Sequence, residues 1–155
     1  MSKPRLAITL GDPAGIGTEV VLKAVSDRSL ADYDLTLVGN LELLIDRYQQ
    51  LRQQIPIEIE LSNPADVKII DVPLDLATRQ GVKIGQGNAA SGAASFAYLD
   101  QAIDRTLAGD FEAIVTAPIA KSAWLAAGHH FPGQTELLAL KAQVDRFGKI
   151  GRAHV

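Results

Sequence analysis

The sequence contains no cysteine, few aromatic residues and no cluster of basic side chains. Without cysteine the protein cannot form disulfide bonds, use a thiolate nucleophile or bind a metal through sulfur. Its 15 lysines and arginines are outnumbered by 18 aspartates and glutamates, which gives a net charge of -3. Because nucleic acids and anionic membranes are bound through basic patches, we expect neither as a partner.

A long apolar run is also missing. Residues 1–5 are followed by only a short apolar stretch and then by Gly-Asp-Pro, so the sequence predicts neither a signal peptide nor a membrane span. A cytoplasmic location is the resulting expectation. The chain is instead 47% hydrophobic and 21% charged over 155 residues, which is typical of a soluble, folded domain.

Short apolar runs alternate with amphipathic stretches along the chain. Strands are predicted at residues 5–10, 34–38, 55–61, 67–72 and 112–116. Helices are predicted at residues 18–26, 41–51, 88–107 and 119–127 and again after residue 136, with a loop at residues 73–87. This alternation favours an α/β fold with a mainly parallel sheet and flanking helices. In such a fold, ligands bind outside the carboxyl ends of the strands.

A glycine-rich turn, L-G-D-P-A-G-I-G-T-E at residues 10–19, joins the first predicted strand to the first predicted helix. Three glycines within seven residues permit backbone angles and close approaches that a side chain would block. The unpaired N–H groups at the start of the helix, for which Thr18 is the expected N-cap, favour an anionic or polar ligand. The alternative is a tight turn whose glycines only satisfy the local geometry.

Neither common nucleotide-binding motif is present at this turn. Its G-x-x-x-G-x-G spacing differs from the dinucleotide fingerprint and lacks the Gly-Lys-Ser/Thr ending of a Walker sequence. Residues 85–90 do match G-x-G-x-x-A and open a helix. They follow a polar segment, residues 78–83, where the fingerprint requires a buried strand, so we interpret them as a chance match.

Two later junctions repeat the arrangement of the glycine-rich turn. The segment T-A-P-I-A-K at residues 116–121 runs from a predicted strand into a helix, and it places Lys121 near the carboxyl end of that strand. A solvated surface lysine is the alternative. The segment G-Q-T-E at residues 133–136 begins another helix, where Gln134 and Thr135 offer an amide and a hydroxyl beside free backbone donors.

The adjacent His129 and His130 raise the question of a metal site. Neighbouring positions rarely direct both rings to one ion, and no third ligand stands at a suitable spacing, so we expect a surface loop. No metal ligand is therefore predicted within the chain.

Together, the three segments resemble the 4-hydroxythreonine-4-phosphate dehydrogenase family of vitamin B6 biosynthesis. Residues 8–17 match its I-T-x-G-D-P-A-G-I-G motif, residues 116–121 its T-[AG]-P-x-x-K motif and residues 133–136 its G-[HQ]-T-E motif. The resemblance covers about residues 4–148 and implies the fold of isocitrate and isopropylmalate dehydrogenases. It also implies NAD-dependent oxidation of 4-phosphohydroxythreonine followed by decarboxylation, assisted by a divalent zinc, cobalt or magnesium ion, in a cytoplasmic homodimer.

The resemblance further implies that Gln134 and Thr135 contact the phosphorylated substrate. Other residues expected to line the site are Gly11, Asp12, Gly15, Gly17 and Lys121. Gln134 stands where enterobacterial members have a histidine, and it can hydrogen-bond but cannot take on a positive charge. Thr18 stands where members usually have proline, a mild change between two residues that start helices.

Family members are roughly double this length and bind their metal through histidines downstream of the residues present here. We therefore expect residues 1–148 to be the amino-terminal part of such an enzyme, inactive by itself, with an open sheet edge and an exposed apolar face. Residues 149–155, K-I-G-R-A-H-V, do not resemble the family's apolar strand and match a translated sequencing adapter. We expect them to be a non-native tail, in which His154 has no functional role.

Two other functions are compatible with parts of the sequence. A β-decarboxylating dehydrogenase of a malate-like diacid has a G-D-G-I-G-P-E loop, but the inserted Pro13 and Ala14 argue against it. A non-catalytic small-molecule binding module would explain why the chain has neither a metal triad nor a nucleophile–base pair. A gene that continues into well-spaced histidines would favour the enzyme, and a stop codon would favour the module.

Overall fold

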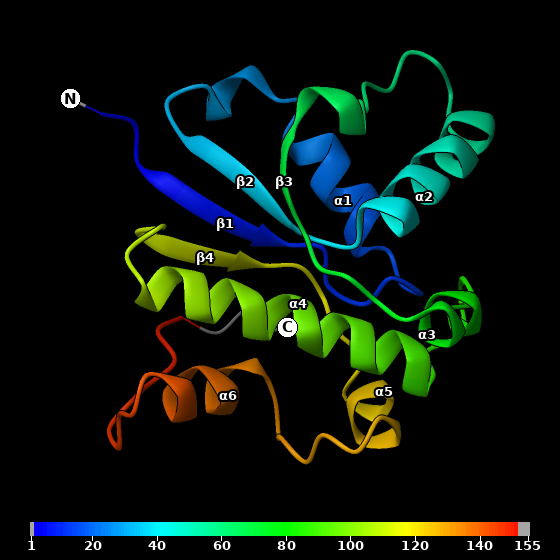
Figure 1. Cartoon of the computed structure of the whole chain (residues 1–155). Coiled ribbons are helices and arrows are strands. Elements are labelled where there is room, and N and C mark those ends of the chain that lie inside the picture. Colours follow the sequence, from blue (N-terminus) through cyan, green and yellow to red (C-terminus); the bar gives the residue numbers. More distant parts are fainter. Residues whose placement is uncertain (1, 152–155) are drawn as a thin grey trace.

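A four-stranded parallel sheet in the order β3-β2-β1-β4 forms the centre of the computed structural model, which describes residues 2–151 (Figure 1). The strands are β1 (Arg5–Thr9), β2 (Asp34–Gly39), β3 (Lys68–Asp71) and β4 (Ala113–Thr116). Ile8 of β1 pairs with Leu37 of β2 and with Val115 of β4. The chain adds β2 and β3 on one side of β1 and then returns to add β4 on the other side. The carboxyl ends of β1 and β4 therefore form a topological switch point, where α/β folds bind ligands.

Helices cover both faces of this sheet (Figure 1). They are α1 (Gly17–Ala24), α2 (Leu41–Gln54), α3 (Leu76–Gly81), α4 (Ala89–Leu107), α5 (Lys121–Ala126) and α6 (Gln134–Lys141), with 3-10 turns η1 (Arg28–Leu30) and η2 (Pro64–Asp66). Helices α1 and α2 pack together against one face, whereas α4 crosses the other face against β1, β2 and β4. Helices α5 and α6 lie outside α4. None of the helices in residues 2–151 is both long and apolar enough to cross a membrane.

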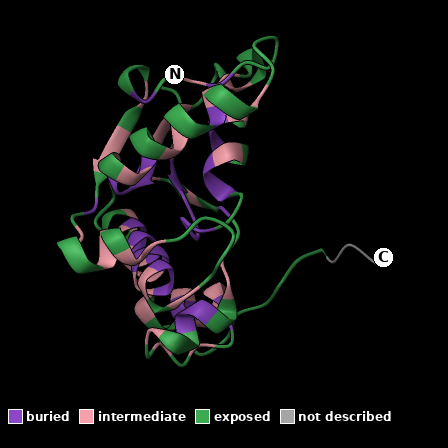
Figure 2. Cartoon of the chain, turned by 90° about the vertical axis from the view of Figure 1, so that its right-hand side faces the viewer, coloured by how far each residue is buried: buried purple, intermediate pink, exposed green. Residues whose placement is uncertain are grey.

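The hydrophobic core includes the sheet and the inner faces of the helices, which Figure 2 shows in purple. Leu22 of α1, Leu37 of β2 and Tyr98 of α4 are each at most 1% exposed and belong to one continuous cluster. Each fully buried leucine contributes about 1.5–3 kcal/mol relative to an exposed one. Packing from both sides thus fixes the strands whose carboxyl ends carry the candidate loops.

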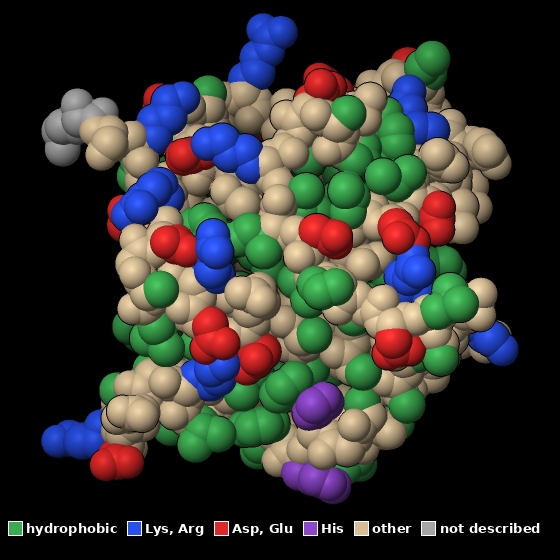
Figure 3. All heavy atoms as spheres, in the orientation of Figure 1, with side chains coloured by type: hydrophobic (Ala, Val, Ile, Leu, Met, Phe, Trp, Pro, Cys, Tyr) green, Lys and Arg blue, Asp and Glu red, His purple; other side chains and the backbone are tan. Residues whose placement is uncertain are grey.

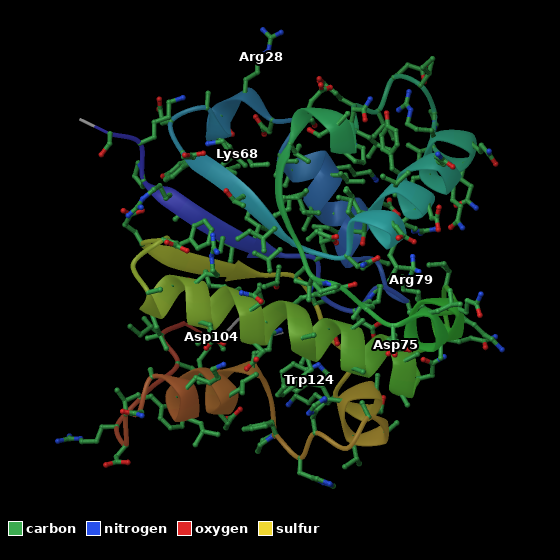
Figure 4. All side chains as sticks on the ribbon, in the orientation of Figure 1. Arg28, Lys68, Asp75, Arg79, Asp104 and Trp124 are labelled. Carbon is green, nitrogen blue, oxygen red and sulfur yellow. The ribbon has the colours of Figure 1, made fainter. Side chains whose placement is uncertain are left out.

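A second apolar cluster attaches α5 and α6 to the outer side of α4. Its buried members are Leu99, Ile103, Trp124 and Leu137. Trp124, labelled in Figure 4, is fully buried, and its indole Nε1 donates a 2.9 Å hydrogen bond to Ser95 Oγ. Gly92 allows α4 and α5 to cross closely, because a Cβ there would overlap the carbonyl group of Ala123. This cluster positions the amino-terminal ends of α5 and α6.

The predicted α/β fold with a mainly parallel sheet and flanking helices is confirmed, and so are four of the predicted strands. The strand predicted at residues 55–61 is wrong. These residues form turns, in which Ile59 N donates a 3.0 Å hydrogen bond to Pro56 O and Ile57 is 80% exposed. Proline has no N–H to give to a neighbouring strand, so the alternating isoleucines here are not a sign of sheet pairing.

Two smaller expectations are also wrong. The stretch expected to be a loop contains α3, which is capped by Asp75: its Oδ1 accepts a 2.9 Å hydrogen bond from Thr78 N. Thr18 is not an N-cap, because it lies buried inside α1 and Ile16 is the capping position. The glycine-rich turn itself is tight enough to begin the helix without a side-chain cap.

An apolar surface lies beside β4, which is an edge strand of the sheet within residues 2–151. Val115 of β4 and Val20 of α1 are each 48% exposed. They line a groove of about 420 Å³ between the strand and the helix. The open sheet edge and the exposed apolar face expected from the sequence are therefore present.

Candidate functional site

The loop after β1 and the loop after β4 touch through their backbones. Asp12 N donates a 2.9 Å hydrogen bond to Pro118 O. Gly11 has a φ of +68°, and a Cβ at this position would overlap the Pro118 carbonyl oxygen. Only glycine combines this left-handed backbone with so close an approach. Gly11 therefore shapes the switch point from within.

Asp12 closes the rest of the glycine-rich turn. Its Oδ1 accepts a 2.8 Å hydrogen bond from Ala14 N, its carbonyl oxygen accepts a 2.9 Å bond from Gly15 N, and the residue is only 4% exposed. Gly17 is buried and leaves no room for a side chain, because a Cβ there would lie 2.6 Å from Leu10 O. Gly15 is exposed, and a Cβ there would make only ordinary contacts. Of the site residues predicted in this turn, Gly15 alone is open to solvent.

Gln134 and Thr135 are the first two residues of α6, as the sequence predicts. Gln134 Nε2 donates a 3.4 Å hydrogen bond to Ala117 O, the carbonyl that follows β4. Because Nε2 is engaged, Gln134 presents Oε1, which is buried and has no partner among the described residues. Thr135 is half-buried and makes no side-chain hydrogen bond within residues 2–151. Each side chain therefore keeps a hydrogen-bonding group that no described residue uses.

Lys121 and Glu136 lie near each other beside Gly133. A Cβ added at Gly133 would lie 3.7 Å from Lys121 Nζ and 3.3 Å from Glu136 Oε2. Glu136 Oε2 is buried without a hydrogen-bond partner in the described chain, and Glu136 Oε1 lies 3.9 Å from Lys149 Nζ. Lys121 is exposed at the start of α5. One cation and one carboxylate thus stand next to the amino terminus of α6.

The three predicted segments meet at Ala117 and Pro118. The glycine-rich turn reaches them through Asp12 and Gly17, where a Cβ would lie 3.2 Å from Ala117 Cβ, and α6 reaches them through Gln134. Sequence reasoning did not single out Glu136 as a site residue. The available signal was an acidic side chain in the first turn of a helix, directly after the Gln-Thr pair.

The remaining sequence motifs have structural roles. His129 stacks on Phe96 with ring centroids 3.5 Å apart and an interplanar angle of 2°, and burial lowers the pKa of His129. Figure 3 shows the two described histidines in purple at the molecular surface.

Residues 85–90 follow α3 rather than a buried strand, and they start α4 through the capping box of Asn88 and Ser91. Their interpretation as a chance match agrees with this context.

The described residues do not assemble a metal centre. Within residues 2–151, no three side chains of His, Asp or Glu lie close enough together to hold one ion. The Asp12 carboxylate already accepts a backbone hydrogen bond, and the His129 ring is stacked on Phe96. The divalent ion implied by the family resemblance therefore does not fit this part of the chain by itself.

Known proteins resemble this chain over nearly its full length. The family model described as "Pyridoxal phosphate biosynthetic protein PdxA" matches residues 19–150. A 4-hydroxythreonine-4-phosphate dehydrogenase from Nostoc sp. is 56% identical, over 96% of this chain and 41% of the relative. The protein of the same description from Synechocystis sp. is 53% identical, over 99% of this chain and 44% of the relative. The crystal structure of 4-hydroxythreonine-4-phosphate dehydrogenase from Klebsiella pneumoniae is 34% identical with a TM-score of 0.75, over 91% of this chain and 45% of that one.

Proposed function

The chain belongs to the family of the pyridoxal phosphate biosynthetic protein PdxA, and on this basis we propose that it is the amino-terminal part of a 4-hydroxythreonine-4-phosphate dehydrogenase. The observation that carries the proposal is the meeting of three family motifs at Ala117 and Pro118, with Gln134 and Thr135 free to bind a ligand. The chain spans only 41% of the length of the Nostoc relative and 44% of the length of the Synechocystis relative. In this proposal, the complete active site also includes residues beyond this chain.

The proposed reaction is oxidation of the hydroxyl group of 4-phosphohydroxythreonine, followed by decarboxylation. NAD supplies the hydride acceptor when bound, and a zinc, cobalt or magnesium ion supplies Lewis acidity. Since the described residues do not fit the ion, its ligands in this proposal belong to the remainder of the enzyme. The complete enzyme is further proposed to be a cytoplasmic homodimer, a state that light scattering of the purified enzyme tests.

Within this reaction, the residues of this chain bind and orient the substrate. The Thr135 hydroxyl and the free N–H groups at the start of α6 donate to the phosphate group, and Lys121 adds a positive charge at the same end of the helix. Gln134, held by Ala117 O, presents Oε1 to a hydroxyl or ammonium group of the substrate. An amide does not titrate, so Gln134 holds the substrate and does not transfer a proton.

A chimeric enzyme tests this function. Residues 1–148 are joined to the carboxyl-terminal remainder of the Nostoc relative. This chimera omits residues 149–155, the predicted non-native tail of the chain. Residues 152–155 of that tail, including His154, lie outside the described residues. The chimera should reduce NAD with 4-phosphohydroxythreonine and prefer it over a malate-like diacid, with the intact Nostoc enzyme as control. Preference for the diacid would support the β-decarboxylating alternative, and a folded chimera that binds substrate without turnover would support a binding module.

A further inference from the structure

Unpaired buried polar atoms gather in two places. Among the described residues they are Arg47 Nε, Arg79 Nε, Tyr98 Oη, Gln134 Oε1 and Glu136 Oε2. Folded proteins pair nearly all such atoms, so each exception calls for a cause. Gln134 and Glu136 belong to the candidate site described above. The other three atoms belong to side chains that line a single hollow, which borders the glycine-rich turn.

This hollow lies between α2 and α3, and its volume is about 390 Å³. Its charged and hydroxyl-bearing lining residues are Thr18, Glu42, Asp46, Arg47, Arg79 and Tyr98. Figure 4 labels Arg79, which reaches from α3 to the first turn of α2 and forms an ion pair with Glu42. The volume falls in the range of small-molecule sites, and the lining combines apolar side chains with a few polar groups, as such sites do.

The charges around the hollow leave one cation available. Arg79 is neutralised by Glu42. Arg47 forms no ion pair among residues 2–151, and its Nη1 donates only a 3.4 Å hydrogen bond to Gln50 Oε1. Asp46 also lines the hollow, but it is exposed, and water screens the charge of an exposed carboxylate. The half-buried Arg47 guanidinium therefore lacks a partner of opposite charge.

Tyr98 adds a neutral donor at the inner wall. The residue is 1% exposed, and burial raises the pKa of its hydroxyl above the ordinary value. The hydroxyl thus keeps its proton at neutral pH and can donate it in a hydrogen bond. Together with the Nε–H groups of Arg47 and Arg79, three donors without acceptors surround the hollow. A ligand that satisfies them must bring acceptor oxygens.

We propose that this hollow is a second binding site, which takes a small organic anion. The carboxylate or phosphate group of the ligand accepts hydrogen bonds from Arg47, Arg79 and Tyr98. The apolar body of the ligand lies against Leu43 and Ile84, which also line the hollow. The glycine-rich turn contributes Leu10 and Pro13 to the same lining. The proposal does not depend on the reaction performed at the candidate site.

Binding of matched probes to the full chain tests the proposal. Hexanoate, hexyl phosphate and 1-hexanol share one apolar body and differ in the head group, so they separate a carboxylate site, a phosphate site and simple apolar binding. In two-dimensional NMR spectra, at least one of the two anions should shift the amide signals of α2 and α3. It should bind at least about tenfold more tightly than 1-hexanol, because hydrogen bonds to charged groups are strong.

Two variants locate the head group. Arg47→Gln removes the charge and should weaken anion binding by about tenfold or more, and Tyr98→Phe keeps the ring in the core and should weaken it several-fold. Arg28→Gln, in the exposed η1 turn, is the control and should leave binding unchanged. The proposal is overturned if 1-hexanol binds as tightly as the anions, if no probe shifts these signals, or if Tyr98→Phe and Arg47→Gln bind like the unaltered chain.

Discussion

The backbone N–H of Asp12 donates a 2.9 Å hydrogen bond to the carbonyl oxygen of Pro118, and this contact joins the loop after β1 to the loop after β4. The two strands are neighbours in the sheet, and the order of the sheet reverses between them. Gln134 is held on the same segment through Ala117 O. The contact therefore sets the relative position of all three family motifs.

Replacing Gly11 by alanine should destabilise the protein. Alanine is strained at a φ of +68°, and its Cβ would meet the Pro118 carbonyl oxygen, so we expect the free energy of unfolding to fall by about 1–3 kcal/mol. Gly15→Ala is the matched control, because a Cβ at this exposed position makes only ordinary contacts. Urea unfolding followed by circular dichroism measures both variants, and equal losses would contradict the role assigned to Gly11.

Removing the hydroxyl group of Ser95 should also cost stability. Ser95 is 1% exposed and accepts the hydrogen bond of Trp124 Nε1, so Ser95→Ala leaves a buried donor unpaired, at a cost of about 1–3 kcal/mol. Trp124 is the one tryptophan of the sequence, and its fluorescence reports the unfolding of this region directly. The exposed Ser29→Ala serves as control. A fluorescence-detected transition at the same urea concentration for both variants would argue against this hydrogen bond.

Stability should fall on acidification through His129. Burial lowers the pKa of its imidazole in the folded state below the ordinary value of 6.5, so the unfolded chain takes up the proton more readily. This contribution of His129 to the free energy of unfolding is present above pH 6.5 and is lost as the pH falls through the folded-state pKa. His129→Phe keeps a ring on Phe96 without titrating, and its stability should depend less on pH in this range. A His129→Phe variant with the same pH dependence as the unaltered chain, or an equal change in His130→Phe, would contradict this role.

Thr135 should matter for substrate binding in the chimera. Thr135→Ala removes a hydroxyl group proposed to donate to the phosphate, and KM for 4-phosphohydroxythreonine should rise by about tenfold or more. Thr135→Ser keeps the hydroxyl group and should bind substrate almost normally. If the alanine variant has an unchanged KM, Thr135 does not contact the substrate.

Apolar patterning was sufficient to predict the sheet and most helices, because β1, β2 and α4 bury side chains at regular spacing. The same patterning failed at Ile57 and Ile59, where Pro56 starts a turn and the isoleucines remain outside the core. It also missed α3, a short polar helix whose start depends on the Asp75 side chain.

The sequence was sufficient to predict that the three motifs lie together, but not how each of their residues packs. Gly11, Gly15 and Gly17 are equivalent in the motif, and only their packing shows that the first and last shape the turn while Gly15 is exposed. The clustering of Arg47, Arg79 and Tyr98 was not visible either, since these residues come from three helices far apart in the chain.

The proposed function is tested most sharply by the initial rate of NADH formation from 4-phosphohydroxythreonine by the chimera, compared with that of the 155-residue chain alone. The chimera should reach a kcat/KM within about tenfold of that of the intact Nostoc enzyme. The chain alone should form no NADH, because the described residues do not provide the ligands of a metal centre. NADH formation by the chain alone, or no NADH from a chimera that folds and assembles like the Nostoc enzyme, would contradict the proposed function.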